Sequence, residues 1–327
     1  MKLKLFLFAA LTITLIGKTN ASCGSSNCPL YNFHYNLEGG LHLRLYTEYI
    51  NQDKIYLGSK LSTIGTVPEE HDEVNTLNSI TAFQAGYGIS NRLDIGFVLP
   101  YVHREHNHIH HENGQTNLEN WNFSGIGDIL LTGNYAVILP SMEKEIFFGI
   151  TAGVKLPSGV TNSVNAEGET AEVTIQPGTG SIDEIIGANF RYPLFTIQTT
   201  EKDVYSAIPL IIGVSYKISG KGTDDYKFGN SLLVTAGTNY QFTKTAGLTL
   251  QFNVRNQDYA DTGTTGEPSA NTGGTWMYLS PGLNLNFTDN LALFGIIQLP
   301  VYINVHGLQQ ASSFNAQIGI SANTTLL

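Results

Sequence analysis

The stretch Leu-Thr-Leu-Gln-Phe-Asn-Val-Arg, residues Leu248–Arg255, decides the fold of this chain. Its apolar side chains fall on every second residue, and Thr, Gln, Asn and Arg occupy the positions between them. Successive side chains of a β-strand point to opposite faces, so this pattern predicts a strand with one apolar face and one polar face.

The same alternation recurs in twelve segments that cover most of the chain. Most of them have 11 to 16 residues. That length exceeds the five or six residues of an ordinary soluble strand and suits a tilted strand that crosses a bilayer. The segments are residues 37–50, 76–89, 92–104, 124–139, 144–157, 181–192, 206–218, 227–241, 246–257, 274–287, 290–304 and 313–326.

The connections between these segments are sorted by length. Residues 51–75, 105–123, 158–180 and 258–273 form long gaps, whereas residues 90–91 and 288–289 form tight turns that fall between them. Long loops on one side and short turns on the other are typical of outer-membrane barrels. An open sheet edge is excluded from hydrocarbon because its backbone groups would stay unpaired.

The expected fold is therefore all-β. We predict a closed antiparallel up-and-down transmembrane β-barrel of about 12 strands over residues 37–327, with long extracellular loops and short periplasmic turns. Such a barrel is expected to have outer-membrane lipid, the outer-membrane assembly machinery and a small-molecule solute as its partners.

Composition narrows the alternatives. Charged residues make up 13% of the 327 residues, and the formal net charge is −10. No basic stripe is present to meet phosphate groups, which argues against nucleic acid as a partner. No repeated runs of about 20 apolar residues are present either, which argues against a bundle of membrane helices.

The N-terminus has the pattern of a secretory signal peptide. Lys2 and Lys4 precede the apolar stretch Leu5–Ile16, and Ala21 offers a small residue at the cleavage position. Residues 1–21 are therefore predicted to be removed after export. This leader and the barrel pattern together predict the Gram-negative outer membrane as the location.

Residues 22–36 form a predicted periplasmic segment that contains both cysteines, Cys23 and Cys28. An oxidising compartment favours a disulfide between them, and a dithiol that binds a soft metal is the alternative. Lipid attachment at Cys23 is disfavoured because Asn20, three residues earlier, is not aliphatic.

The alternation also predicts which polar side chains face the interior. Structural ion pairing that fills the bore and a charged lining of a narrow channel are both open interpretations. Asp128 and Lys155 are the leading candidate pair because they lie on neighbouring predicted strands. The full set is Glu38, His42, Arg44, Glu48, Asp94, Asp128, Lys155, Asp183, Arg191, Lys217 and Arg255.

The second predicted long loop is rich in histidine. Neutral imidazole suits Zn, Cu and Ni, and His-rich tracts are typical of metal binding. The candidate ligands are His103, His106, His108, His110 and His111. Two alternatives are a simply exposed polar loop and a cap over the bore that packs with Trp121. A third is a segment that changes charge with pH.

Two motifs resemble hallmarks of a known family. They are Phe-Ser-Gly-Ile-Gly-Asp-Ile-Leu-Leu-Thr-Gly-Asn-Tyr at residues 123–135 and Gly-Val-Lys-Leu-Pro-Ser-Gly at residues 153–159. They are similar to the meta-pathway of phenol degradation proteins, a bacterial family of transporter-like outer-membrane barrels. The resemblance extends loosely over most of the chain after residue 21. It implies a barrel fold and passage of aromatic or other apolar compounds, and it brings no catalytic residue.

Three functions follow from these observations. The first is a passive channel or transporter for small, apolar or aromatic molecules, with a His-rich loop that binds a transition metal. The second is a surface barrel for metal binding or adhesion that transports nothing. The third is an outer-membrane lipid hydrolase, which is disfavoured because no Gly-x-Ser-x-Gly motif occurs and no predicted strand presents both His and Ser to the bilayer. We therefore expect no enzymatic activity and no cofactor apart from such a metal.

Overall fold

The computed structural model describes residues 36–65, 71–112, 115–141, 145–198, 205–265 and 269–326. The predicted signal peptide, Cys23 and Cys28 lie outside these residues. Within the described part of the chain, no helix is long and apolar enough to cross a bilayer.

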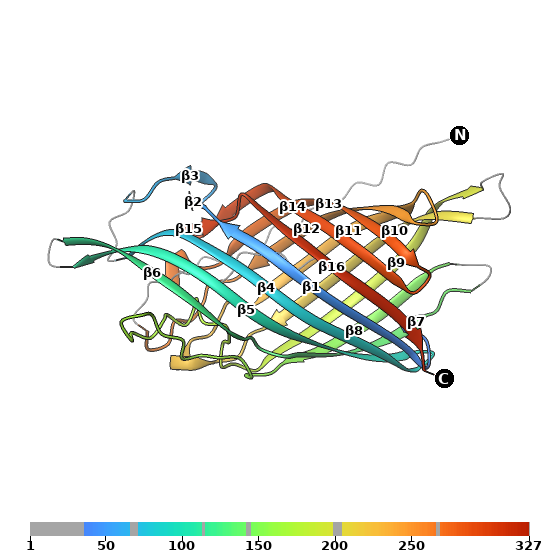
Figure 1. The fold of residues 1–327 in the computed structure, drawn as a ribbon, viewed down its shortest axis with the longest axis horizontal. Coiled ribbons are helices and arrows are strands. Elements are labelled where there is room, and N and C mark those ends of the chain that lie inside the picture. The colour runs from blue at the N-terminus through green and yellow to red at the C-terminus, as the bar shows by residue number, and fades with distance from the viewer. Residues whose placement is uncertain are drawn as a thin grey trace.

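The described strands form a closed barrel with twelve strand positions, as predicted (Figure 1). Every pair is antiparallel, and the pairing of β4 with β5 closes the sheet. β6 and β7 share one position because both pair with β5, one beyond the other along its length. The barrel strands are β1 (Gly40–Gln52), β4 (His71–Ser90), β5 (Leu93–Glu112), β6 (Gln115–Ile126), β7 (Leu130–Ile138), β8 (Phe147–Lys155), β9 (Asp183–Gln198), β10 (Tyr205–Ile218), β11 (Ser231–Gln241), β12 (Ala246–Gln257), β13 (Gly274–Thr288), β14 (Leu291–Val305) and β16 (Phe314–Thr325).

The two ends of the barrel differ in what they carry. One end, here called the turn end, has the short connections 91–92, 242–245 and 289–290, and the C-terminal residues lie there (right in Figure 1). The opposite end, here called the loop end, carries the segment 156–182 and the small elements between strands. These are β2 (Lys54–Leu57), β3 (Lys60–Ser62), β15 (Leu308–Ala311), η1 (Thr223–Asp225) and η2 (Ser269–Asn271). β2, β3 and β15 form a separate sheet beside the barrel.

The alternation read from the sequence is the alternation of the barrel wall. On β12, Leu248, Leu250 and Phe252 are exposed, whereas Gln251 and Asn253 between them are buried. Side chains that point into a closed barrel are covered by the opposite wall, whereas no protein atoms cover those that point outward. The buried face is therefore the interior, and it is polar, while the exposed outer face is apolar. This is the arrangement of a barrel that meets lipid on its outside.

The prediction of a long loop at residues 105–123 is wrong. β5 continues to Glu112 and β6 begins at Gln115, so the histidine segment is a strand in a hairpin that projects beyond the barrel (Figure 1). The alternation is hard to see there because the outward side chains of the hairpin, such as Glu105, Asn107 and Asn120, are polar too. Polarity on both faces made a strand look like a loop.

Two other boundaries differ from those expected. The segment predicted as one strand over residues 124–139 breaks at residues 127–129, between β6 and β7. β9 extends to Gln198 and β10 begins at Tyr205, so both strands are longer than the predicted segments 181–192 and 206–218.

Candidate functional site: a charged network and a polar cavity inside the barrel

The two motifs that carry the family resemblance meet inside the barrel. The segment 156–182 turns back into the loop end, where Val160 donates its backbone N–H to Ile126 and Gly178 donates to Val160. Gly159 and Gly178 touch so closely that a Cβ on Gly178 would lie 2.5 Å from the carbonyl carbon of Gly159. Glycine at both positions is therefore required for this inward fold.

Asp128 occupies the break between β6 and β7 and binds both motifs together. Its Oδ1 accepts the backbone N–H of Gly159 at 2.9 Å, and its Oδ2 accepts the backbone N–H of Thr179 at 2.9 Å. The ammonium of Lys155 lies 2.7 Å from the same Oδ2. The ion pair predicted between Asp128 and Lys155 is thus present.

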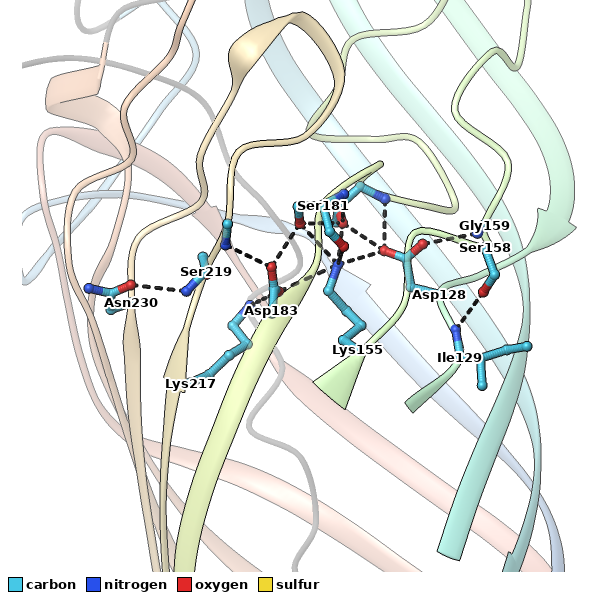
Figure 2. Close-up of polar contacts among 12 residues, drawn as sticks. Asp128, Ile129, Lys155, Ser158, Gly159, Ser181, Asp183, Lys217, Ser219 and Asn230 are labelled. Atoms are coloured by element: carbon cyan, nitrogen blue, oxygen red, sulfur yellow. Dashed lines mark hydrogen bonds and ion pairs between the residues drawn. The ribbon is translucent and has the colours of Figure 1, made fainter. Parts of the chain in front are cut away.

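The network extends across the next two strands, as Figure 2 shows. Asp183, at the start of β9, has its Oδ2 3.4 Å from the ammonium of Lys155 and 3.4 Å from that of Lys217. Its Oδ1 accepts the hydroxyl of Ser181 at 2.8 Å and the backbone N–H of Gly220 at 3.1 Å. A carboxylate that is 1% exposed thus has both oxygens satisfied.

Two lysines and two aspartates make this network electrically balanced. Burial of a charge is tolerated when the charge is paired and hydrogen-bonded, and each of the four groups meets that condition here. The network ties β8, β9 and β10 to the segment 156–182. Its geometry holds that segment in place inside the loop end.

Two apolar clusters also pack at the loop end. Trp121 and Phe123 on β6 pack against Ala171 and Ile175 of the inward segment. A second cluster joins Val173 of that segment to Tyr226 and Ala260, from two further connections. The loop end is therefore packed with side chains, and Trp121 contributes to this packing from strand β6.

The candidate metal ligands do not gather at one point. His106 and His108 are buried, and their ring centroids lie 5.4 Å apart. His103 lies on the opposite face of β5, where its Nδ1 is 2.8 Å from the hydroxyl oxygen of Ser124. The side chains of His110 and His111 lie outside the described residues. Among the described side chains, no group of three or more His, Cys, Asp or Glu residues is placed to hold a metal ion.

Both buried histidines have partners. Thr76 donates its hydroxyl proton to Gln310 at 2.6 Å, so the 2.7 Å contact between Thr76 and Nδ1 of His106 requires the imidazole to donate. The proton of neutral His106 is therefore on Nδ1 and its lone pair on Nε2. Nε2 of His108 lies 3.1 Å from a carboxylate oxygen of Glu119.

The turn end is built differently. Asn36, just before β1, is buried and donates its backbone N–H and its amide to Asp94 at 3.2 and 3.1 Å. Asn134 donates to the other oxygen of Asp94 at 2.6 Å. The chain thus enters β1 along the inner face of the barrel, where hydrogen bonds from neutral donors to the buried carboxylate of Asp94 hold it.

A cavity of about 170 Å³ opens in the interior near the turn end. β1, β12, β13, β14 and β16 supply its wall, and His42 and Arg44 are its ionisable residues. His42 and Arg44 are both buried, and Nδ1 of His42 lies 2.6 Å from the amide oxygen of Asn323. This cavity gives a small molecule room inside the barrel.

The other predicted interior residues are distributed along the bore. Glu48 accepts a hydrogen bond from Gln317 at 2.6 Å, and the guanidinium of Arg255 lies over the ring of Trp276 at 5.2 Å. Glu38 is exposed because it lies in the turn before β1 begins, and Arg191 on β9 is exposed as well. These two residues therefore lie outside the buried polar set.

Sequence reasoning missed the polar residues of the inward segment. Thr179 and Ser181 both contact Lys155, yet they lie in or beside a stretch predicted as a free external loop. A signal was available in the alternation of Ala171, Val173 and Ile175 with polar residues inside the predicted loop, and all three are buried in the structure.

No protein-family model and no curated protein sequence matches this chain. Among solved structures, the chain is similar to the COG4313 outer membrane channel from Pseudomonas putida F1, with a TM-score of 0.60 and 13% identity over 88% of this chain and 96% of that one. It is also similar to the transport unit of the autotransporter AIDA-I from Escherichia coli, with a TM-score of 0.50 and 9% identity over 91% and 94%. At these identities the likeness shows the fold alone: the chain has the fold of a Gram-negative outer-membrane β-barrel.

Proposed function

We propose that the protein is a passive outer-membrane conduit for small molecules. The observation that carries the proposal is the polar cavity in the interior of a barrel whose outer face is apolar. A barrel that served only as an anchor would need no solvated space inside, whereas a polar interior with room for a molecule is typical of channels. The fold similarity to a solved outer membrane channel supports the same proposal.

The solute class is proposed to be small molecules with an apolar or aromatic part, as the resemblance to the meta-pathway of phenol degradation proteins implies. The packed loop end makes passage narrow, because the inward segment 156–182 fills the interior there. A solute that crosses the whole barrel must pass between this segment and the wall, or the segment must move.

Single-channel conductance of the refolded barrel in a planar bilayer tests the proposal. A gel shift between unboiled and boiled samples first confirms that the barrel is folded. Small, defined current steps are expected from the folded protein and none from the boiled sample. Folded barrels that insert and pass no current would contradict the aqueous conduit. They would favour the alternative of a surface barrel that binds metal or mediates adhesion and transports nothing.

A transition-metal site remains a second proposal, supported by the 5.4 Å separation of the His106 and His108 rings. Nitrogen ligands of this kind suit Zn or Cu. Titration with Zn should show weaker binding when both are changed, in His106→Ala/His108→Ala, than in the wild-type protein. His103→Ala is the matched control because His103 lies on the other face of the same strand. Equal affinity in all three proteins would remove the proposal.

The leader and the cysteine pair are likewise proposals. N-terminal sequencing of the protein from the outer membrane should begin at residue 22. Both reduced and unreduced protein would then be treated with N-methylmaleimide, which adds only to free thiols. A mass difference of two labels between the two samples would indicate that Cys23 and Cys28 form a disulfide.

A further inference from the structure

Arg44 is a buried cation that no carboxylate of the described residues contacts, and Glu48 on the same strand attracts it only through space. The Arg44 side chain extends from the inner face of β1, and the residue is 5% exposed. The guanidinium lies 4.2 Å from the centre of the Phe294 ring and 5.2 Å from that of Tyr46. Among the described residues, no carboxylate and no other hydrogen-bond acceptor is bonded to it.

This situation differs from that of the other buried charges. The lysines of the charged network each have a carboxylate within 3.4 Å, and Arg104 donates to the amide oxygen of Asn78. Glu48, the acidic residue nearest to Arg44 along the inner face of β1, accepts a hydrogen bond from Gln317. The aromatic contacts stabilise the Arg44 cation but leave its N–H donors unused, because a ring face accepts no conventional hydrogen bond.

Arginine is also the side chain best suited to a carboxylate. Its planar guanidinium presents parallel N–H groups that match both oxygens of a carboxylate, and such bidentate pairs are among the strongest hydrogen bonds in proteins. A desolvated guanidinium whose donors meet no acceptor among the described residues is therefore suited to bind a carboxylate.

The cavity beside Arg44 is large enough to supply that partner. Its volume of about 170 Å³ is more than five times the ~30 Å³ share of a water molecule, so it holds a small organic molecule rather than a single ion. Thr249, Gln251 and Asn284 line one side with hydrogen-bonding groups, and Phe294 and Ile296 line another with apolar surface. The wall thus offers a cation, neutral polar groups and an apolar patch together.

We propose that this cavity is a binding subsite for a small carboxylate-bearing solute with an apolar or aromatic body. The carboxylate pairs with the guanidinium of Arg44, and the apolar part of the solute lies against Phe294 and Ile296. This proposal assigns a solute class to the proposed conduit and rests on that function for passage of the solute. Binding at the subsite is a separate event that is measured without any current.

Fluorine NMR of 4-fluorobenzoate, titrated with the refolded full-length barrel in detergent micelles, tests the binding directly. Binding broadens the fluorine line, and Arg44→Gln is expected to weaken the affinity by at least tenfold, while Arg44→Lys keeps the charge and weakens it less. Arg255→Gln is the matched control, because it removes the same charge from the interior away from the cavity and is expected to leave the affinity unchanged. A gel shift on boiling establishes that every variant is folded.

The neutral analogue 4-fluorobenzyl alcohol separates charge pairing from apolar partition into the micelle. It should bind the wild-type protein and Arg44→Gln equally. Equal affinity of 4-fluorobenzoate for wild type and Arg44→Gln would overturn the proposal, and so would the absence of binding to the wild-type protein.

Conductance measured on the same samples distinguishes the two proposals. A barrel that binds 4-fluorobenzoate through Arg44 and passes no current would retain the subsite and contradict the conduit. A barrel that conducts and binds no 4-fluorobenzoate would retain the conduit and contradict the subsite. If both hold, benzoate should block the current of the wild-type protein and not that of Arg44→Gln.

Discussion

The two ends of the barrel interior handle charge in opposite ways. At the loop end, Lys155 and Lys217 are held by Asp128 and Asp183, and apolar clusters pack beside them. At the turn end, no carboxylate of the described residues contacts Arg44, which borders a cavity. Saturated charges stabilise structure, whereas an unsaturated charge next to empty space is available to a ligand. The loop end is therefore a packed structural closure, whereas the turn end contains the cavity proposed to bind the solute.

The largest expected effect comes from removing the side chain at the centre of the closure. Trp121→Ala should lower the free energy of unfolding by about 3–5 kcal/mol, because a buried aromatic ring is lost from the contact between β6 and the inward segment. The temperature at which the folded band disappears on unboiled gels measures this loss. The variant should also conduct more than wild type, because the closure is loosened.

Leu118→Ala is the control for this change. Leu118 lies on the same strand and is 67% exposed, so its truncation should change stability by less than about 0.5 kcal/mol. If both substitutions lowered the free energy of unfolding equally, or if Trp121→Ala left the conductance unchanged, the loop end would not be a packed closure.

The next effect in size compares a buried carboxylate from each end. Asp183→Asn should cost about 3 kcal/mol, because it leaves Lys155 and Lys217 without their shared counterion. Asp94→Asn should cost about 1–2 kcal/mol, because Asp94 is hydrogen-bonded by the neutral groups of Asn36 and Asn134. Thermal unfolding of the two variants in the same detergent measures the difference.

A second substitution sharpens this comparison. Lys217→Met added to Asp183→Asn should recover part of the lost stability, because it removes the charge that Asp183→Asn leaves uncompensated, whereas Lys155 keeps its ion pair with Asp128. Without any recovery, the cost of Asp183→Asn would have to come from the lost hydrogen bonds of Ser181 and Gly220 rather than from charge.

The smallest effect lies outside the barrel wall, where Asp53 follows β1 at the loop end. Burial opposes ionisation of its carboxyl, but hydrogen bonds from Ser313 and Lys54 outweigh burial and hold its pKa below the usual value. A carboxyl with a lowered pKa stabilises the folded state at pH values above its unfolded pKa of about 3.9, and this contribution disappears as the pH falls through the folded pKa.

Asp53→Asn should therefore lower stability by less than about 1 kcal/mol at pH 7, and the difference from wild type should shrink at pH 3. Thermal unfolding of both proteins at the two pH values tests this expectation. A difference that grows on acidification would contradict the sign of the pKa shift.

Much of the architecture was predictable because it depends on a local rule. Alternation with a period of two places Leu248 and Gln251 on opposite faces wherever the strand lies in the barrel. Because long and short connections alternate along the chain, the long ones fall at one end of the barrel and the short ones at the other. The same rule placed Asp128 and Lys155 inward and near each other, and their ion pair is present. The rule failed at residues 105–123 because the projecting hairpin is polar on both faces.

The sequence by itself therefore determined the closed barrel, its apolar outer face and most of its polar inner face. The tertiary structure was needed to show that the segment 156–182 folds inward, that His106 and His108 belong to a strand, and that no carboxylate of the described residues contacts Arg44. The physical reason is that each of these facts depends on which side chains from distant strands meet across the interior. Local alternation assigns a side chain to a face, whereas register and closure of the whole sheet determine its neighbours.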